Sequence, residues 1–233
     1  MRMRRKPWTE PVIDSCPFFV TSPSTHRGSW GKLFAQSAPI WLEIGCGKGV
    51  ATAAMAADQT GINLIAVDEV RHVLAVTIQN VQQVYQDKPV DNLRLSCVDA
   101  TRLYDTFDRS DGIERIIISF PNPWNHKAKH HKRRLTHPHQ LLQYRNILAT
   151  DGCIYFKTDD LPLFQASKRY LHECAFDIIY ETDDLHASGY TPNYVSEHEK
   201  LFTLKGLPVH FLIARMLPAP PVDRKSTRLN SSH

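Results

Sequence analysis

Residues 40–57, IWLEIGCGKGVATAAMAA, contain a complete strand–turn–helix unit. The apolar run Ile40–Ile44 is typical of a strand that is buried on both faces. Glycines follow at positions 45, 47 and 49, and the Ala-rich stretch 50–57 is expected to form a helix. A glycine turn between a strand and a helix N-terminus offers backbone N–H groups to an anionic group of a ligand. The unit therefore predicts a ligand-binding turn at the carboxyl end of a buried strand.

Strands and helices continue to alternate along the rest of the chain. Further strands are expected at 63–67, 93–98, 116–120, 154–157, 176–182 and 210–216, and further helices at 70–85, 138–148 and 163–174. This alternation predicts an α/β fold: a doubly wound, mostly parallel sheet of the seven-stranded type, with helices on both faces.

The 233 residues are enough for one domain with a full core, and the composition is that of a globular protein. Residues 1–27, rich in Pro, Ser, Thr and Arg, are predicted to form an irregular basic N-terminal arm. Residues 28–217 are predicted to be the domain, and residues 218–233 a non-globular tail. The last ten residues, RKSTRLNSSH, resemble translated vector or adapter sequence, so the chain from Val222 onward is left out of the fold prediction.

Cysteine usage and hydropathy indicate a cytoplasmic protein. The five cysteines are odd in number and form no C-x-x-C pair, which favours free thiols and gives little support to a zinc site. No apolar run approaches the ~20 residues of a membrane-spanning helix. We therefore expect no metal and no membrane.

Three acidic residues lie at the ends of successive predicted strands: Glu43, Asp68 and Asp99. Glu43 is unsuited to a pyrophosphate but suits an ammonium group, and the third glycine comes one residue too early for the dinucleotide fingerprint. S-adenosylmethionine carries an ammonium and a carboxylate without a phosphate. We therefore predict that Glu43, Gly45 and Gly47 bind S-adenosylmethionine, with Asp68 on the ribose hydroxyls and Asp99 on the adenine amino group. The alternatives are a glycine turn that serves packing alone, solvated acids at strand ends, and Glu69 in place of Asp68.

The segment after the strand at 116–120 combines a proline-rich loop with a cationic block. Pro121 and Pro123 flank Asn122, and residues 126–134 hold five Lys/Arg and three His without an acid. Because the block follows a loop at the carboxyl end of a strand, it predicts contact with a polyanion. The alternatives are a solvated surface and a histidine metal site, and the latter has no nearby acid or cysteine to support it.

Five segments resemble the tRNA (guanine-N7-)-methyltransferase family: HRGSWGKLF (26–34), LEIGCGKG (42–49), SFPNPWNHKAKHHKRRLT (119–136), FKTDDLPLF (156–164) and EHEKLFTLKGLPV (197–209). The resemblance covers about residues 25–216 and fits the bacterial single-chain branch. It implies a Rossmann-like class I methyltransferase fold and S-adenosylmethionine as methyl donor. It also implies methylation of guanine N7 in tRNA, at the variable-loop guanosine, position 46.

The resemblance also implies roles for individual residues. Glu43, Asp68 and Asp99 match the family's cofactor-contacting acids. The residues that match substrate contacts are Lys127, Asp159, Ser196 and Glu199. In the last segment, Ser196-Glu-His-Glu199 stands where the family has Thr-x-Tyr/Phe-Glu. The number of subunits, monomer or homodimer, stays open.

Asn122 departs from the family, which has Asp between these prolines as the catalytic residue; an extra residue, Asn125, also follows Trp124. By position, Asn122 is the candidate catalytic residue and a cofactor contact. Guanine N7 carries no proton, so methyl transfer needs no general base, and Asn122 can still accept one hydrogen bond. We expect weakened activity. The alternatives are a silent relative that binds tRNA or cofactor, and an enzyme with another RNA or small-molecule acceptor.

Overall fold

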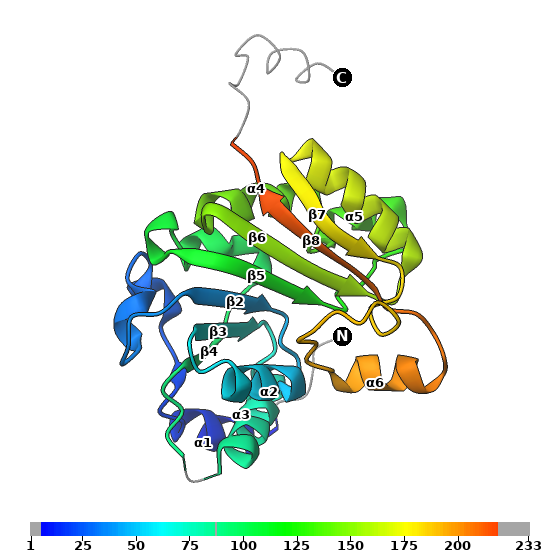
Figure 1. The fold of residues 1–233 in the computed structure, drawn as a ribbon. Coiled ribbons are helices and arrows are strands. Elements are labelled where there is room, and N and C mark those ends of the chain that lie inside the picture. Colours follow the sequence, from blue (N-terminus) through cyan, green and yellow to red (C-terminus); the bar gives the residue numbers. More distant parts are fainter. Residues whose placement is uncertain (1–5, 87, 219–233) are drawn as a thin grey trace.

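The structure, a computed structural model, describes residues 6–86 and 88–218. Within them the chain forms an eight-stranded sheet in the order β1-β4-β3-β2-β5-β6-β8-β7 (Figure 1). The strands are β1 (Phe19–Val20), β2 (Ile40–Ile44), β3 (Asn63–Asp68), β4 (Leu93–Cys97), β5 (Ile113–Ser119), β6 (Leu148–Thr158), β7 (Phe176–Thr182) and β8 (His210–Met216). β8 runs antiparallel to β6 and β7, and the other pairs are parallel. The predicted doubly wound, mostly parallel fold is confirmed.

Helices cover the two faces of the sheet. The helices α1 (Thr9–Asp14), α2 (Val50–Asp58) and α3 (Arg71–Tyr85) pack together on one face (Figure 1). The helices α4 (Pro138–Ile147) and α5 (Leu161–Glu173) lie on the other face, and α6 (Glu197–Leu204) lies beyond the carboxyl ends of β2, β5 and β6. Short 3-10 helices are η1 (Pro23–His26), η2 (Trp30–Leu33), η3 (Ala100–Asp105), η4 (Arg109–Asp111) and η5 (Ala128–Arg133).

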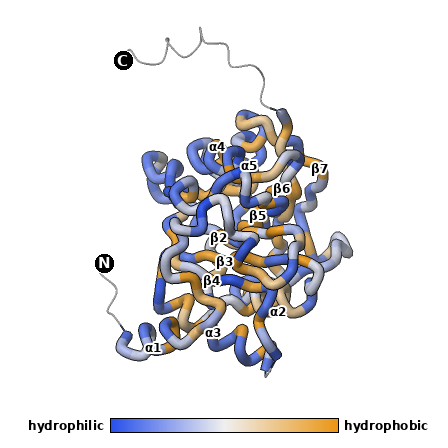
Figure 2. Tube along the Cα trace, turned by 90° about the vertical axis from the view of Figure 1, so that its left-hand side faces the viewer, coloured by the Kyte–Doolittle hydropathy of each residue, from blue (hydrophilic) through white to orange (hydrophobic). Residues whose placement is uncertain are grey.

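Alternate residues of the central strands enter different hydrophobic clusters. Leu42 and Ile44 of β2 pack in the cluster with α4 and α5, whereas Trp41 packs in the cluster with α2 and α3. Because both faces are covered, β2 is buried along its whole length, and Glu43 is the one residue of the strand that is not apolar. Figure 2 shows the same pattern, with hydrophobic stretches in the region of the sheet and hydrophilic stretches toward the outside.

A third, smaller cluster fills the α2–α3 face over β6 and β8. It contains Leu185, Val209, Phe211 and Ile213. No helix lies on this part of the sheet among the described residues; the segment 183–196, between β7 and α6, covers it instead. This segment forms one wall of the site described below.

The prediction of an irregular arm over residues 1–27 is wrong for residues 9–20. α1 packs on α3, and β1 pairs with the edge of β4, adding an eighth strand to the expected seven. Ile13, Phe18 and Phe19 are buried there. Elements of six and two residues are too short to show a periodic pattern, and their stability comes from packing on the domain. The basic residues 1–5 and the predicted tail from residue 219 onward lie outside the described residues.

The five cysteines form no disulfide; Cys16 and Cys174 are buried and the other three half-buried. Across residues 6–86 and 88–218, no helix combines the length and the apolar character needed to cross a membrane. The same residues contain no group of three or more His, Cys, Asp or Glu side chains that could hold a metal ion.

Candidate active site

The glycine turn after β2 is held in place by β3 and α3. Asp68 at the end of β3 accepts hydrogen bonds from the backbone N–H of Gly47 (3.0 Å) and of Val70 (2.9 Å). Thr77 of α3 donates its hydroxyl to the Gly47 carbonyl at 2.7 Å. Gly49 has a φ of +73°, and a Cβ at this position would lie 2.1 Å from Cγ2 of Thr77. Only glycine therefore fits at position 49, where the helix α2 begins.

Glu43 lies under this turn as a buried carboxyl with one hydroxyl partner. Its side chain is within β2, the residue is 4% exposed, and Thr52 of α2 donates a hydrogen bond to it at 2.6 Å. Burial raises the pKa of Glu43, while the Thr52 hydroxyl and the nearby Lys157 ammonium oppose that shift. A cation that binds beside Glu43 would offset the cost of its burial.

A solvent-open cleft of about 680 Å³ leads from Glu43 along the glycine turn. Its lining combines the turn, the end of β5 and the start of α6: Glu43, Gly45–Ala51, Ser119, Phe120 and Ser196–His198. The structure thus brings together three segments that lie far apart in the sequence.

The other two predicted cofactor acids lie at the neighbouring strand ends and do not line this cleft. Asp68 borders the turn through its bond to Gly47. Asp99 is exposed at the N-cap of η3, where it accepts from the Thr101 N–H (2.8 Å) and hydroxyl (2.7 Å). Glu43 lies near the end of β2, Asp68 is the last residue of β3 and Asp99 follows β4, and these three strands are adjacent in the sheet. A ligand that reaches all three would extend across these strand ends.

The proline loop after β5 has a constrained backbone. Phe120 and Trp124 have φ values of +52° and +51°, in the left-handed region that non-glycine residues rarely adopt. Asn122 is exposed between them, and its side-chain oxygen accepts from the Trp124 N–H at 3.0 Å. The side chain of Asn122 therefore closes a local turn, and it does not line the cleft.

Arg134, the last cation of the basic block, anchors this loop. It is 4% exposed, and it donates to the Pro123 carbonyl (2.8 Å) and to the side chain of Asn125 (2.9 Å). Asn125 in turn donates to Asp160, the N-cap of α5, at 2.6 Å. The extra residue of this chain is thus part of the support of the loop. The prediction that the block faces a polyanion as far as Arg134 is wrong for Arg134 itself.

Asp159 and α6 form the wall opposite the glycine turn. Ser196 caps α6 by accepting from the Glu199 N–H at 3.1 Å. His198 lies 3.3 Å from Asp159, with ring centroids 4.9 Å from Phe120 and 4.6 Å from Phe202. The imidazole therefore takes the stacking place of an aromatic ring, which explains how His fits where the family has Tyr or Phe.

Glu199 is fully buried and does not face the cleft. Lys157 of β6 contacts one carboxylate oxygen at 2.6 Å, and Asn193 (2.7 Å) and His186 (3.0 Å) contact the other. Lys157 also donates to the Asn193 side chain and to the Tyr194 carbonyl. We did not predict Lys157, Asn193 or His186 as site residues. Lys157 had one sequence signal, because it is a cation inside an apolar strand.

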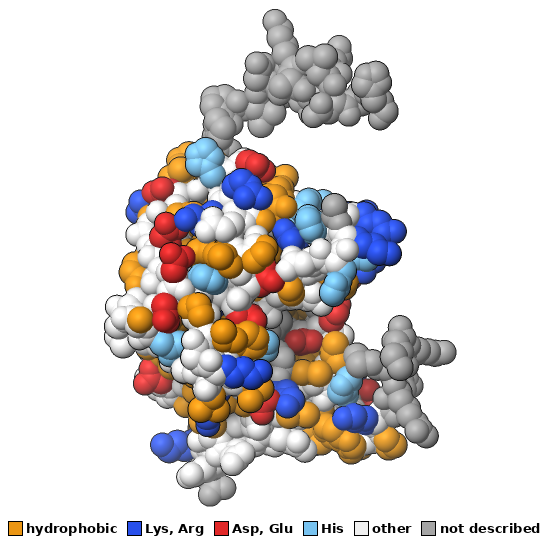
Figure 3. Space-filling model, turned by 90° about the vertical axis from the view of Figure 1, so that its right-hand side faces the viewer, with side chains coloured by type: hydrophobic (Ala, Val, Ile, Leu, Met, Phe, Trp, Pro, Cys, Tyr) orange, Lys and Arg blue, Asp and Glu red, His pale blue; other side chains and the backbone are white. Residues whose placement is uncertain are grey.

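The basic block, residues 126–134, lies on the same side of the molecule as the cleft and α6 (Figure 3). Figure 3 views this side and shows Lys, Arg and His side chains gathered beside a hollow. Lys127 precedes η5, and Lys127, Lys129, Lys132 and Arg133 are exposed. Arg133 also lies over the Trp124 ring at 5.0 Å, which connects the block to the proline loop.

Comparison with known proteins identifies the family. Residues 37–212 match the model of a family described as putative methyltransferases. A tRNA (guanine-N(7)-)-methyltransferase of Clostridium perfringens is 46% identical over 220 residues, which cover 93% of this chain and 100% of the relative. The chain belongs to this methyltransferase family. A second member, from Acetivibrio thermocellus, is 44% identical over 216 residues, covering 92% of this chain and 99% of that one.

Solved structures share the fold at much lower identity. The 16S rRNA methyltransferase KamB has a TM-score of 0.59 at 11% identity, covering 81% of this chain and 93% of that one. The [4+2]-cyclase SpnF has a TM-score of 0.54 at 13% identity, covering 81% and 78%. These likenesses support the class I methyltransferase fold and nothing narrower.

The cofactor of the family, S-adenosylmethionine, fits the residues present. Its ammonium suits the buried Glu43 carboxyl, which lines the cleft beside the glycine turn. The acids at the next two strand ends can accept from ribose and adenine donors, as predicted from the sequence.

Replacing Glu43 with glutamine should separate stability from binding. Because burial raises the pKa of Glu43, the charged carboxylate is disfavoured in the folded protein. The contribution of Glu43 to the free energy of unfolding therefore falls as the pH rises above the pKa that Glu43 has in the unfolded chain. Glu43→Gln should therefore be more stable than the parent at pH 7, and the difference in the free energy of unfolding between the two should become small near pH 4. It should bind S-adenosylmethionine about 10- to 100-fold more weakly, because a charged partner is lost. Denaturant unfolding at both pH values and calorimetric titration test this; a variant less stable than the parent at pH 7 would refute it.

Proposed function

We propose that this chain transfers a methyl group from S-adenosylmethionine to N7 of guanine in tRNA, at the variable-loop guanosine, position 46. The observation that carries the proposal is 46% identity along the full length of a tRNA (guanine-N(7)-)-methyltransferase. The cleft beside Glu43 and the exposed basic block support it, because they supply a place for the donor and a surface for the tRNA.

The reaction depends mainly on the alignment of guanine N7 with the methyl group. S-adenosylmethionine supplies a methyl group on a positively charged sulfur. Guanine N7 has a lone pair and no proton, so the chain has no proton to remove and must hold N7 in line with the methyl group. Glu43, the turn at Gly45 and Gly47, Asp68 and Asp99 would hold the donor. The rigid loop around Asn122 would hold the base against it.

The acceptor side is assigned to residues on three segments. Lys127 would contact a tRNA phosphate, which positions the RNA. Asp159 and Ser196 would contact the nucleotide at the wall formed by α6. Glu199 accepts an N–H from the Asn193 amide and lies 3.0 Å from a ring nitrogen of His186, and guanine N1–H and N2–H are donors of the same kind as the amide. Glu199 would therefore reach the base by exchanging these partners, and otherwise acts by holding the wall.

A silent relative, the alternative that Asn122 raised, finds no support in the comparisons, since the relatives named above all carry the methyltransferase name. We therefore expect the missing charge at Asn122 to lower the rate of methyl transfer and not to abolish it. We propose that the protein is cytoplasmic, which the tRNA substrate and the free thiols support. The number of subunits stays open.

The proposal is tested by transfer of labelled methyl from S-adenosylmethionine to tRNA that lacks the modification. We expect incorporation that depends on tRNA and is absent with DNA of the same length. Incorporation that is equal with and without tRNA would contradict the proposal.

Reversing the charge of Lys132 and Arg133 should weaken tRNA binding and flatten its salt dependence. Each lost phosphate contact lowers the slope of log K against log salt by about 0.7 to 0.9, so the double change should lower it by about 1 to 2. Lys32→Glu with Lys88→Glu is the control, because it changes the net charge equally at exposed sites outside the block. Filter binding at low and at high salt measures the affinity for tRNA and its salt dependence. Equal slopes for the two double variants would rule out this surface.

A further inference from the structure

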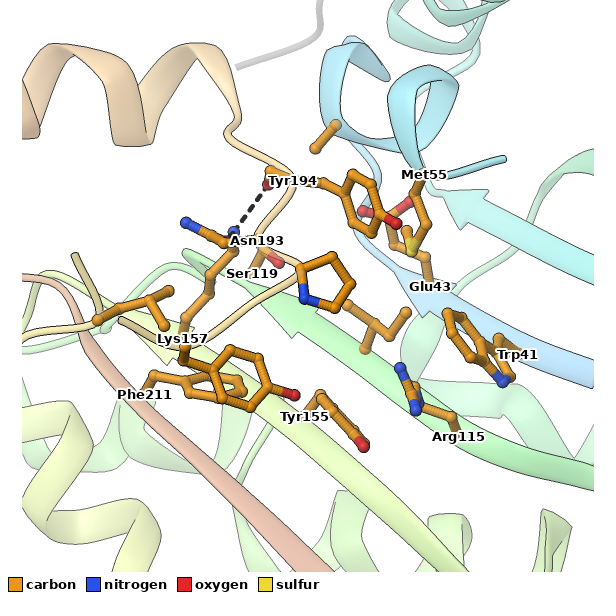
Figure 4. A pocket seen from close by; sticks show the side chains of 15 residues that line it. Trp41, Glu43, Met55, Arg115, Ser119, Tyr155, Lys157, Asn193, Tyr194 and Phe211 are labelled. Atoms are coloured by element: carbon orange, nitrogen blue, oxygen red, sulfur yellow. Dashed lines mark hydrogen bonds between the residues drawn. The ribbon is translucent and has the colours of Figure 1, made fainter. Parts of the chain in front are cut away.

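A second cavity, which is open to solvent and measures about 590 Å³ with that open space included, lies next to the cleft, between the sheet and the segment 185–194 (Figure 4). We call it the inner cavity. It shares Glu43, Ala51 and Ser119 with the cleft, and no residue of the proline loop or the basic block lines it. Its walls are rich in aromatic rings, which come from both the sheet and the covering segment: Trp41, Tyr155, Tyr190, Tyr194 and Phe211.

Arg115 of β5 lies on the floor of the inner cavity between two aromatic rings. Its guanidinium carbon is 3.6 Å from the centroid of the Trp41 ring and 3.9 Å from that of the Tyr155 ring. Figure 4 shows the guanidinium between these two residues. Because both rings approach within van der Waals distance, they hold the guanidinium in a fixed place and restrict its rotamers.

The N–H groups of Arg115 have no protein partner among residues 6–86 and 88–218. Neither a hydrogen bond nor an ion pair from Arg115 is formed in this part of the chain, although the residue is half-buried. Glu114 and Asp151 line a hollow on the other side of Arg115, but neither forms an ion pair with it within 4 Å. A guanidinium carries five N–H donors in one plane, in the arrangement that binds carboxylate or phosphate with two parallel hydrogen bonds.

We propose that the inner cavity is a binding site for a ring-bearing oxyanion, with Arg115 on the oxyanion and the aromatic walls on the ring. The cavity is open to solvent, so a ligand need not be enclosed in it, and the aromatic lining suits a nucleobase. No residue predicted from the sequence to contact substrate lines the cavity, so the site is separate from those contacts.

The guanine that is methylated does not fit against Arg115. Arginine pairs with guanine through O6 and N7, which would cover the atom that must accept the methyl group. The opposite edge of guanine presents N1–H and N2–H donors, which do not pair with a donor such as Arg115. The oxyanion is therefore the group that Arg115 recognises.

Calorimetric titration with guanosine 5′-monophosphate tests the site in the full-length protein. The titration is made with S-adenosylhomocysteine present in excess, so that the cofactor cleft is occupied. We expect binding that persists under these conditions and weakens at least about 10-fold in Arg115→Gln. Arg115→Lys keeps the charge but lacks the planar guanidinium, so its affinity for the nucleotide should lie between those of the parent and Arg115→Gln. Guanosine and inorganic phosphate, titrated separately, should each bind more weakly than the nucleotide.

Arg215→Gln is the matched control, since Arg215 is an exposed arginine on β8 and should bind the nucleotide as the parent does. Three outcomes overturn the proposal: no binding of the nucleotide, displacement of the nucleotide by S-adenosylhomocysteine, or equal binding by Arg115→Gln and the parent. Circular dichroism of each variant shows whether it is folded, and Arg115→Lys carries the test if Arg115→Gln is not. The readout is binding, so it is independent of methyl transfer to tRNA.

Discussion

Replacing Lys157 with methionine is expected to lower the free energy of unfolding by about 3–5 kcal/mol, because it leaves the Glu199 carboxylate buried without its cation. The side chains of Lys157 and Glu199 are 10% and 0% exposed, and their charged atoms are 2.6 Å apart. Methionine preserves most of the apolar stem and removes only the ammonium. Chemical denaturation at pH 7 measures the difference.

Two variants isolate the buried charge as the cause. Lys168→Met breaks another Lys–Glu contact of 2.6 Å, to Glu181, but there the side chains are 30% and 47% exposed, so a loss of about 0–1 kcal/mol is expected. The double variant Lys157→Met with Glu199→Leu removes both charges and should recover most of the stability. It should not recover methyl transfer, because α6 then loses the contact that holds its first turn at the cleft. If Lys157→Met lowered the free energy of unfolding no more than Lys168→Met does, the Lys157–Glu199 pair would not hold the wall that α6 forms.

Restoring the family's acid with Asn122→Asp is expected to speed methyl transfer by about 10- to 100-fold. A carboxylate would offset the positive charge that develops on the guanine, which a neutral amide cannot do. The two side chains have the same shape, and one oxygen of the Asp can keep the bond to the Trp124 N–H. Single-turnover methylation at saturating tRNA and S-adenosylmethionine measures the step directly.

Asn146→Asp is the control for Asn122→Asp. Asn146 is exposed on α4, and the change adds the same charge away from the loop, so it should leave the rate unchanged. An Asn122→Asp variant that is no faster than the parent would mean that the loop does not present this residue to the base.

The central fold was predictable because its strands are buried on both faces. Such strands read as apolar runs that end where the ligand site begins, and both β2 and β3 follow this pattern. The N-terminal elements were not predictable, since α1 and β1 are too short for a periodic signal. Their structure depends on contacts with α3 and β4 that lie 50 or more residues away.

Position along a strand was enough to predict that Glu43 and Asp68 lie at the carboxyl edge of the sheet, beside the glycine turn. The site was not predictable where function depends on contacts between distant segments. The resemblance matched Glu199 to a contact with the base, but it gave no sign of the partners that bury it, Lys157 and His186. In the same way Arg134 appears in the sequence as one cation in a block, and only its contact with Pro123 shows its structural role.

The most direct test of the account is to map the methylated atom. Borohydride adds hydride to the positively charged ring of N7-methylguanosine, and the reduced base is then lost from its ribose. Aniline breaks the RNA chain at this abasic ribose by β-elimination. After incubation of unmodified tRNA with the protein and S-adenosylmethionine, the account predicts one new break, at the variable-loop guanosine, which disappears when that guanosine is replaced by adenosine. No break, or breaks only at other guanosines, would contradict the account.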